Sequence, residues 1–391
     1  MKKVKLIAVE THPIQYKAPL FRLLAAHPRI DLHVLYAMIP DRAQQGAGFG
    51  VDFEWDVPLL SGYSYSLLEN VAKEPSVTRF GGCDTPSILS ELKSRQPNAV
   101  LVNGWVVKMC LQALWACKRL KIPCWVRGEA NLLRPRAWWK HAIHRQLLYR
   151  YDGYLAIGQA NRDFYRFHKC PEDRIGWAPY AIENERFAQA ATERAAERAA
   201  IRAAWRIPEQ AVVFLFSGKL IDKKRPMDIL QALALLPDDV RAKAHVLFVG
   251  DGPLRSALQA WAAEQRLPVT FAGFINQSRI PDAYVASDVL VLPSDAGETW
   301  GLVVNEAMAS HVPAVVSTAV GCCRDLVIEG ETGYSFSLGD IGTFAKVMQR
   351  YVEEPACARE QGARACLHIE KFSLQAAVAG VVDALEHGLS D

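Results

Sequence analysis

The stretch VLVLPSDAGETWGLVVNEAMA (289–309) joins an unbroken apolar run to a pattern typical of a helix. The run has no polar alternation, which indicates a strand of a parallel sheet buried on both faces. Glu298 precedes the helix, and Glu306 lies roughly 7.5 Å along its axis at 1.5 Å per residue. The two carboxylates are either solvated surface groups or groups that face a ligand held at the N-terminal end of the helix.

Length and composition describe a globular protein with more than one domain. The chain has 391 residues, half of them apolar and 22% charged, which suits two domains of roughly 200 residues or fewer each. A net charge of +3 is too small to imply a nucleic acid partner. The nine cysteines are odd in number and include no C-x-x-C pair. They indicate thiols in a reducing cytosol rather than a disulfide framework or a zinc site.

We expect no targeting segment in the first residues of the sequence. MKKVKLIAVE (1–10) is positively charged, but its apolar run ends at Glu10 and is too short for the core of a signal peptide. A buried first strand explains this run better. No other stretch approaches the length of a membrane span. We therefore expect a cytoplasmic protein.

Short apolar runs alternate with helix-like stretches along both halves of the chain. This pattern predicts two doubly wound, Rossmann-like α/β domains, each a parallel sheet with helices on both faces. The predicted strands are 4–9, 31–36, 99–103, 123–127, 153–157, 211–218, 245–250, 269–274, 289–293 and 313–318. The predicted helices are 18–26, 85–95, 106–120, 137–150, 160–168, 189–205, 226–236, 254–265, 281–286, 301–310 and 340–353.

The two domains are predicted to meet near residue 185, with a central cleft between them. The N-terminal domain covers residues 1–185, and the second covers residues 186–372. Residues 373–391 are expected to form a C-terminal helix that packs back on the N-terminal domain. QQGAGFG (44–50) is expected to be a mobile loop.

Basic residues and a free helix N-terminus are predicted to meet at one edge of the second sheet. Lys219 and Lys224 follow strand 211–218. The backbone N–H groups of residues 301–303, with the helix dipole behind them, form an anion site. Together these groups suit a diphosphate, and the flanking Glu298 and Glu306 can accept hydrogen bonds from sugar hydroxyls. The pattern predicts a nucleotide-sugar pocket.

Four stretches carry a family resemblance. SGKLIDKKRP (217–226), FVGDGPL (248–254), FAGF (271–274) and residues 293–327 resemble the donor domain of retaining glycosyltransferases of family four, which have the GT-B fold. The resemblance covers essentially the whole chain, but its specific motifs lie in the second half. It implies an N-terminal acceptor-binding domain, a nucleotide-sugar donor-binding domain, and a role in the synthesis of a bacterial surface polysaccharide.

The resemblance also implies roles for single residues. Glu298 and Glu306 match the E-x7-E pair, with Glu298 near the hydroxyls of the donor sugar and Glu306 at the ribose. Lys219 and Lys224 match the basic pair on the diphosphate, although the first is usually an Arg, whose bidentate fork Lys219 lacks. The predicted catalytic residues are Glu298, Lys219 and Lys224. The predicted donor-binding residues are Gly218, Gly252, Thr299, Trp300, Gly301, Leu302, Val303 and Glu306.

The acceptor side is more ambiguous. Polar residues follow the first strand in ETHPIQYKAPLF (10–21), where members of the family often have a Gly-rich loop. Each of these residues is either an acceptor contact or an ordinary turn residue. Arg127 and Glu129 stand near the position of a cleft histidine found in many relatives, as a catalytic pair or as an internal pair that fixes the loop. The candidates on this side are His12, Gln15, Tyr16, Trp105, Arg127 and Glu129.

The stretch LLRPRAWWKHAIHRQLLYRY (132–151) combines five Arg or Lys residues with two Trp residues and contains no acid. A basic helix with exposed Trp suits the surface of an anionic membrane. The alternative is a helix that packs its apolar face on the sheet and leaves its basic face in solvent. Lipid-linked acceptors, which are common in the family, favour peripheral membrane contact.

Other chemistries are disfavoured. No two Asp residues are separated by a single residue, so the metal-binding DxD of the other major glycosyltransferase fold is absent, as are H-E-x-x-H, Walker A and G-x-S-x-G motifs. We expect a retaining glycosyltransferase that transfers a sugar from a nucleotide diphosphate to a hydroxyl of a glycan or lipid-linked acceptor, without a metal or other cofactor. A sugar-nucleotide epimerase of the same fold and a non-catalytic nucleotide-sugar-binding protein are the alternatives. A nicotinamide dehydrogenase ranks last, because the G-x-G-x-x-G fingerprint is missing.

Overall fold

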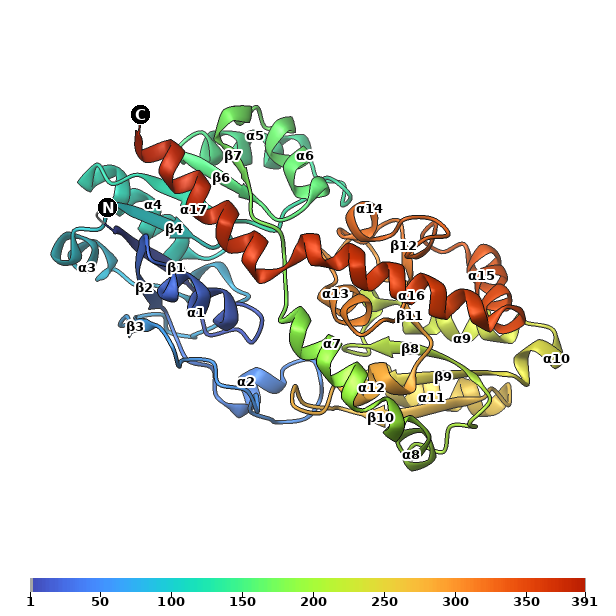
Figure 1. Cartoon of the computed structure of the whole chain (residues 1–391). Helices are drawn as coiled ribbons and strands as arrows, with labels where there is room; N and C mark the ends of the chain where they lie inside the picture. Colours follow the sequence, from blue (N-terminus) through green and yellow to red (C-terminus); the bar gives the residue numbers. More distant parts are fainter. Residues whose placement is uncertain (1–2, 391) are drawn as a thin grey trace. The chain divides into compact units, whose positions relative to one another are not determined.

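The computed structural model describes residues 3–390 and divides the chain into two units (Figure 1). Unit 1 contains the residues up to 41, residues 58–180 and the residues from 374 onward. Unit 2 contains residues 42–57 and 181–373. The division differs from the predicted one chiefly in residues 42–57, which join unit 2 although their neighbours in sequence belong to unit 1. Residues 1, 2 and 391 of the predicted domains lie outside the described part.

The described residues of unit 1 form a seven-stranded parallel sheet with the order β3-β2-β1-β4-β5-β6-β7. Its strands are β1 (Val4–Glu10), β2 (Ile30–Tyr36), β3 (Ser64–Leu67), β4 (Ala99–Val102), β5 (Cys124–Val126), β6 (Gly153–Ala156) and β7 (Ile175–Trp177). Leu6 of β1 lies opposite Leu32 of β2 and Ala99 of β4. Both faces of the sheet are covered, because Ile7 and Leu6, which point to opposite sides, are both buried.

The described residues of unit 2 form a six-stranded parallel sheet with the order β10-β9-β8-β11-β12-β13. Its strands are β8 (Val212–Ser217), β9 (Ala244–Val249), β10 (Val269–Gly273), β11 (Val289–Leu292), β12 (Ala314–Ser317) and β13 (Gly333–Phe336). Phe214 and Phe216 of β8 pack with residues of the helices on one face. The neighbouring Val213 and Leu215 are buried on the other face. The prediction of two Rossmann-like parallel sheets is confirmed.

Helices flank both sheets. They are α1 (Ala18–Ala26), α2 (Arg42–Gly46), α3 (Ile88–Arg95), α4 (Lys108–Leu120), α5 (Trp138–Leu148), α6 (Gln159–Phe167), α7 (Asn184–Glu193), α8 (Arg198–Ala204), α9 (Pro226–Ala234), α10 (Asp238–Arg241), α11 (Arg255–Glu264), α12 (Pro281–Ala286), α13 (Leu302–Ala309), α14 (Cys323–Leu326), α15 (Ile341–Glu353), α16 (Pro355–Ile369) and α17 (Leu374–Ser390). Helix α17 belongs to unit 1, where it packs against β6, β7 and α1 (Figure 1). Within residues 3–390, no helix has the length and apolar character needed to span a membrane.

The predicted helix 189–205 is wrong as a single element. The structure ends α7 at Glu193 and begins α8 at Arg198, with a short 3-10 turn between them. The break has a tertiary cause: Arg194 pairs with the buried Asp282, and Arg198 and Arg202 turn toward the start of β11. Helix propensity along an Ala-rich stretch is a weak preference that such contacts override.

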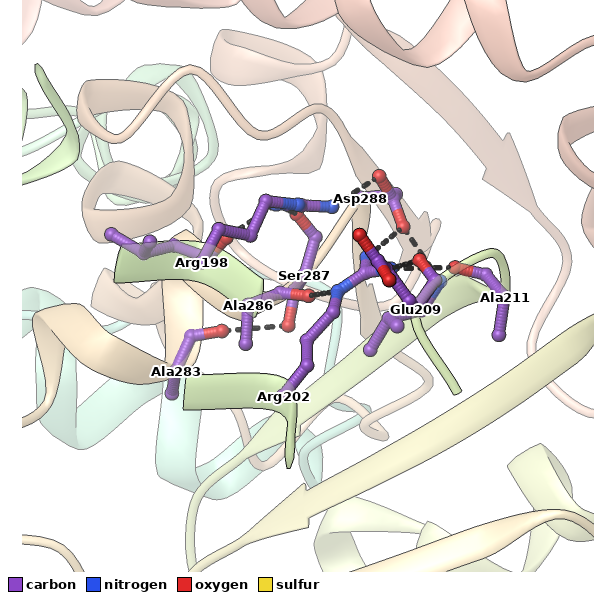
Figure 2. Close-up of polar contacts among 10 residues, drawn as sticks. Arg198, Arg202, Glu209, Ala211, Ala283, Ala286, Ser287 and Asp288 are labelled. Atoms are coloured by element: carbon purple, nitrogen blue, oxygen red, sulfur yellow. Dashed lines mark hydrogen bonds and ion pairs between the residues drawn. The ribbon is translucent and has the colours of Figure 1, made fainter. Parts of the chain in front are cut away.

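Arg202 fastens α8 to the sheet of unit 2 (Figure 2). Its guanidinium donates to the carbonyls of Ala286, Glu209 and Ala211 at 2.8, 2.6 and 3.0 Å, and to Asp288 at 2.8 Å. The same Asp288 carboxylate accepts a bond from the backbone N–H of Val213. A buried cation with its donors paired in this way ties α8 to the start of β8 and of β11.

Candidate active site

The strand order of unit 2 marks one place where a ligand can bind. The chain runs from β8 outward through β9 and β10, then returns to add β11 on the other side of β8. In such a sheet, the crevice outside the carboxyl ends of the strands at this reversal is the usual ligand site. Lys219 and Lys224 follow β8, and Glu298 follows β11, so the sheet brings the three predicted catalytic residues to this crevice.

Lys224 and Glu298 form an ion pair across the reversal point. Their side chains are 13% and 14% exposed, so both charges are largely removed from water. Gly218 lies beneath Lys224, because a Cβ added there would lie 3.7 Å from the Cε atom of the lysine. The pair holds a cation and a carboxylate next to one another, where a diphosphate and a sugar hydroxyl would need them.

Lys219 is held by residues from a distant part of the sequence. Its Nζ donates to the carbonyl of Ala47 at 2.5 Å and lies 4.8 Å from the centre of the Phe49 ring. Burial lowers the pKa of Lys219 below its usual value, and the neighbouring cations Lys223 and Lys224 lower it further. A phosphate placed beside this lysine would relieve the mutual repulsion of the three cations.

The N-terminus of α13 requires a glycine. Gly301 has φ +102°, and a Cβ there would come 2.8 Å from Leu292 Cδ2. The N-cap residue Gly301 provides no side-chain cap, and no acid lies in the first turn of the helix. Leu302 and Val303 are partly exposed, and their N–H groups have no carbonyl to bind within the helix. That they bind an anion stays a prediction.

Three of the predicted donor contacts have structural roles. The Trp300 ring is only 3% exposed, donates to Asn305 at 2.8 Å and packs near Phe372, so it is buried rather than presented to a donor. The Gly252 N–H donates to the Asp251 carboxylate at 2.8 Å. Thr299 is partly exposed, and its backbone carbonyl packs so closely on Gly321 that a Cβ on that glycine would clash with it. Aromatic and glycine identities alone could not distinguish ligand contacts from packing.

Glu306 is held by a tyrosine that the sequence did not reveal. The hydroxyl of Tyr284 donates to its carboxylate at 2.5 Å. Burial raises the pKa of Glu306, while the Tyr284 hydrogen bond and the cations Arg186 and Lys224 oppose that rise. Tyr284 lies on α12 and Arg186 on α7, so no local spacing connects either residue with Glu306.

In unit 1 the strand order reverses between β1 and β4. At the carboxyl end of β1, Lys17 donates to Glu10 at 2.6 Å, and both side chains are buried. His12 is partly buried with its ring nitrogen 2.8 Å from the Thr11 hydroxyl. Burial lowers the pKa of His12 to about 4, and Lys17 contributes to the shift. Gln15 is partly exposed on the same loop. Glu10, which was predicted only to end the apolar run of the first strand, is the partner that fixes this loop.

Arg127 and Glu129 both contact Tyr180. The Tyr180 hydroxyl donates to Glu129, and the Arg127 guanidinium lies over the ring at 4.9 Å. Arg127 also donates to the carbonyls of Ala178 and Pro179 and is only 6% exposed. The Tyr16 ring lies 5.7 Å from that of Tyr180. Arg127 therefore fixes the segment before Tyr180, which corrects its placement as an acceptor contact.

Trp105 is part of the core of unit 1. Its ring stacks with that of Phe164 at 6.0 Å and is 9% exposed. A Cβ on Gly128 would lie 2.2 Å from the Trp105 ring. The residue packs β4 against neighbouring elements, which corrects its prediction as an acceptor contact.

Helix α5 presents its aromatic residues to the outside. Trp138, Trp139 and Ile143 are 81%, 49% and 58% exposed, and Leu148 is the buried residue of this helix. The Lys140 ammonium lies 5.3 Å from the centre of the Trp139 ring. Leu147 and Leu148 pack on the core of unit 1, so the helix has a packed side as well as exposed aromatic residues, and membrane contact stays a prediction.

Comparison with known proteins identifies the region around the unit 2 site. Residues 197–366 match the family model described as glycosyl transferases group 1. A D-inositol 3-phosphate glycosyltransferase of Streptomyces avermitilis is 32% identical over 188 residues, which cover 45% of this chain and 40% of that protein. The chain spans about half the length, or less, of the curated relatives that it matches.

Solved structures resemble the chain over almost its whole length. Anabaena HepE in complex with UDP and glucose has a TM-score of 0.71 at 15% identity and covers 98% of this chain and 100% of its own. WaaG, a glycosyltransferase involved in lipopolysaccharide biosynthesis, has a TM-score of 0.69 at 14% identity, with 97% and 99% covered. At such identities the likeness is one of fold. The chain has the GT-B fold, and its residues 197–366 match the model of the group 1 glycosyl transferases.

Proposed function

We propose that the chain is a retaining glycosyltransferase that transfers a sugar from a nucleotide diphosphate to a hydroxyl of a glycan or lipid-linked glycan. The observation that carries the proposal is the Lys224–Glu298 pair at the reversal point of the unit 2 sheet, beside Lys219 and the start of α13 at Gly301. A diphosphate needs cations and free N–H groups, and a sugar needs a carboxylate to accept its hydroxyls. This crevice offers both.

The reaction requires charge stabilisation more than a strong nucleophile. The bond between the sugar C1 and the diphosphate breaks, and a bond forms between C1 and the acceptor oxygen. In a front-face reaction, the proton of the acceptor hydroxyl passes to the departing diphosphate. Lys219, Lys224 and the N–H groups of α13 stabilise the negative charge that develops on that group. Metal is not required in this proposal, because these groups offset the charge themselves.

The two glutamates have separate tasks. Glu298, released from Lys224 as the diphosphate takes over the lysine, accepts hydrogen bonds from the donor sugar. Glu306, held by Tyr284, accepts a bond from the ribose. HepE is described in complex with UDP and glucose, which makes a uridine diphosphate sugar the first donor to test.

A donor screen tests the reaction. Binding of UDP, GDP, ADP and dTDP is measured by calorimetry, and sugar transfer from the matching sugar nucleotides to lipid-linked glycans is followed by mass spectrometry with and without EDTA. We expect acceptor-dependent transfer that survives EDTA and gives a product with the anomeric configuration of the donor by NMR. Conversion of the donor without an acceptor would identify an epimerase. Binding without turnover across a broad acceptor panel would identify a non-catalytic protein.

We also propose that the chain acts in the synthesis of a surface polysaccharide, at the cytoplasmic face of a membrane. Support for the pathway comes from the fold shared with WaaG. Support for membrane contact comes from α5, which exposes Trp138 and Trp139 among basic residues and carries no acid. Trp favours the membrane interface, and each basic residue near an anionic surface adds about 1 kcal/mol.

Vesicle sedimentation tests the membrane contact. Wild-type protein is expected to bind vesicles that contain phosphatidylglycerol and not vesicles of phosphatidylcholine alone. The Trp138→Ala, Trp139→Ala double variant should lose most of this binding. Phe80→Ala, which removes an aromatic side chain of 56% exposure outside α5, is the matched control. Equal binding of the double variant and the control would refute the contact through α5.

A further inference from the structure

Residues 42–57, named the strap here, lie between β2 and β3 in sequence but belong to unit 2. An aromatic cluster fastens the strap to the residue that follows β10. The Phe53 ring stacks on the Phe274 ring at 4.1 Å, with Phe49 and Trp55 at 5.1 and 6.4 Å from the same ring. Three rings of the strap packed around the Phe274 ring make a stable anchor, because aromatic side chains bury much apolar area.

Polar contacts lock the end of the strap in the same place. Asn276 donates to the carbonyl of Glu54 at 2.6 Å. The Asp56 carboxylate accepts a bond from the backbone N–H of Ser278 at 3.0 Å and a second from the Ser278 hydroxyl. Ring contacts and hydrogen bonds therefore hold the strap along residues 274–278.

From this anchor the strap reaches Lys219. Its turn at Gly48 has φ +84°, and a Cβ there would lie 3.1 Å from Lys219 Cδ. The carbonyl of Ala47 accepts a hydrogen bond from the Lys219 ammonium, and the Phe49 ring lies 4.8 Å from it. Both groups interact more strongly with a charged ammonium than with a neutral amine.

We propose that the strap is a positioning element of the donor site, which keeps Lys219 aimed and charged for the diphosphate of a nucleotide donor. The inference rests on the proposed function and adds to it residues far from the donor motifs in sequence. Phe49 and Ala47 act through Lys219 and are positioning residues, not catalytic ones.

The lysine needs such support because its surroundings oppose its charge. Burial and the cations Lys223 and Lys224 all lower the pKa of Lys219. The Ala47 carbonyl and the face of the Phe49 ring stabilise the ammonium form and so work in the opposite direction. An ammonium has three N–H donors, so one bond to Ala47 leaves donors for phosphate oxygens. Holding the side chain in place before the donor arrives also reduces the entropy lost on binding.

The test replaces the ring and keeps its bulk. Phe49→Leu should weaken binding of UDP, or of the tightest nucleoside diphosphate in the donor screen, by about 2- to 30-fold, the span of a cation–π contact. Its affinity should also decline at a lower pH than that of the wild type in titrations from pH 7 to pH 10, because Lys219 loses its proton more easily. Phe49→Tyr keeps the ring face and should restore both the affinity and the pH profile.

Trp115→Leu is the matched control. Its ring lies 5.2 Å from the Arg150 guanidinium in unit 1 and is 55% exposed, so the variant also removes a cation–π pair. It should bind the diphosphate as the wild type does. If the wild type binds and Phe49→Leu matches it in affinity and pH profile, the role of the strap is refuted. If the wild type binds no nucleoside diphosphate, the proposed function fails first, and the inference fails with it.

Discussion

Removing the cation of the Lys224–Glu298 pair is the most direct test of the donor site. Lys224→Met keeps the length of the side chain and removes its charge. The variant loses one charge-assisted hydrogen bond to the diphosphate, worth about 1.5–3 kcal/mol. At 1.4 kcal/mol per factor of ten, this corresponds to roughly 10- to 150-fold weaker binding of the nucleoside diphosphate.

The burial of the pair places the expected loss toward the upper end of that range. Glu298 is 14% exposed, so without Lys224 its carboxylate stays beside the diphosphate with little water to screen the repulsion. Transfer should fall further than binding, because charge on the leaving group grows in the transition state. We expect kcat/KM to drop by about 100- to 1000-fold, in line with the loss of one such donor in other enzymes.

The assay compares two lysines on the same turn. Lys223 is exposed and donates to the Gly297 carbonyl at 3.4 Å, so Lys223→Met should change diphosphate affinity by less than about threefold. Calorimetry gives the affinities, and circular dichroism shows whether each variant is folded. If Lys224→Met unfolds, the double variant Lys224→Met, Glu298→Gln removes both charges and allows the measurement. A folded Lys224→Met protein that binds UDP within threefold of Lys223→Met would refute the reasoning.

Three further predictions concern stability, measured by urea unfolding. Arg202→Met should lower the free energy of unfolding by about 3–5 kcal/mol, because it leaves Asp288 and several carbonyls without their buried cation. Arg198 also pairs with Asp288 but is more exposed, so Arg198→Met should lower the free energy of unfolding by less. Burial raises the pKa of Glu306, so above about pH 4.5 the folded state keeps a proton that the unfolded chain has lost. Glu306→Gln should therefore gain stability relative to wild type as pH rises above that value. A stability difference between the two proteins that does not change with pH would contradict this. Burial, followed by the charge of His168, lowers the pKa of His144 to about 4, so wild type should lose stability as pH falls from about 6.5 toward 4, and His144→Phe should lose less.

The central strands were predictable because they are buried on both faces. Residues 289–292 are all apolar, and residues 212–217 are apolar up to Ser217, so runs of this kind leave little choice of structure. The missed strands β3, β7 and β13 are the short outer strands of their sheets. Ser64–Leu67 is partly exposed and half polar, so its pairing with β2 comes from backbone hydrogen bonds that leave no apolar pattern in the sequence.

The meeting of Lys224 and Glu298 was predictable for a related reason. Lys224 and Glu298 each follow a recognisable strand, and the parallel topology alone brings them to one edge of the sheet. The burial of Trp300 was not predictable, because its neighbour Phe372 lies far along the chain. The same holds for the strap: QQGAGFG (44–50) indicates only a loop, and its partners Lys219 and Phe274 are more than 150 residues away. Contacts between distant residues of unlike type leave no local periodicity to detect.

The charges of the donor crevice are arranged as pairs that a ligand can take over. A largely buried Lys224 without Glu298, or Glu298 without Lys224, would carry the cost of an isolated charge in the ligand-free protein. Paired, both are stable, and an arriving diphosphate replaces the carboxylate as the partner of the cation. The carboxylate is then free for a sugar hydroxyl at the moment the sugar is present. Lys219 has weaker partners, the Ala47 carbonyl and the Phe49 ring face. A phosphate can bind Lys219 beside these partners, whereas it must displace the Glu298 carboxylate to bind Lys224. A nucleoside diphosphate should therefore contact Lys219 without displacing its partners and open the Lys224–Glu298 pair to reach Lys224, and the sugar of the full donor should then bind the freed Glu298.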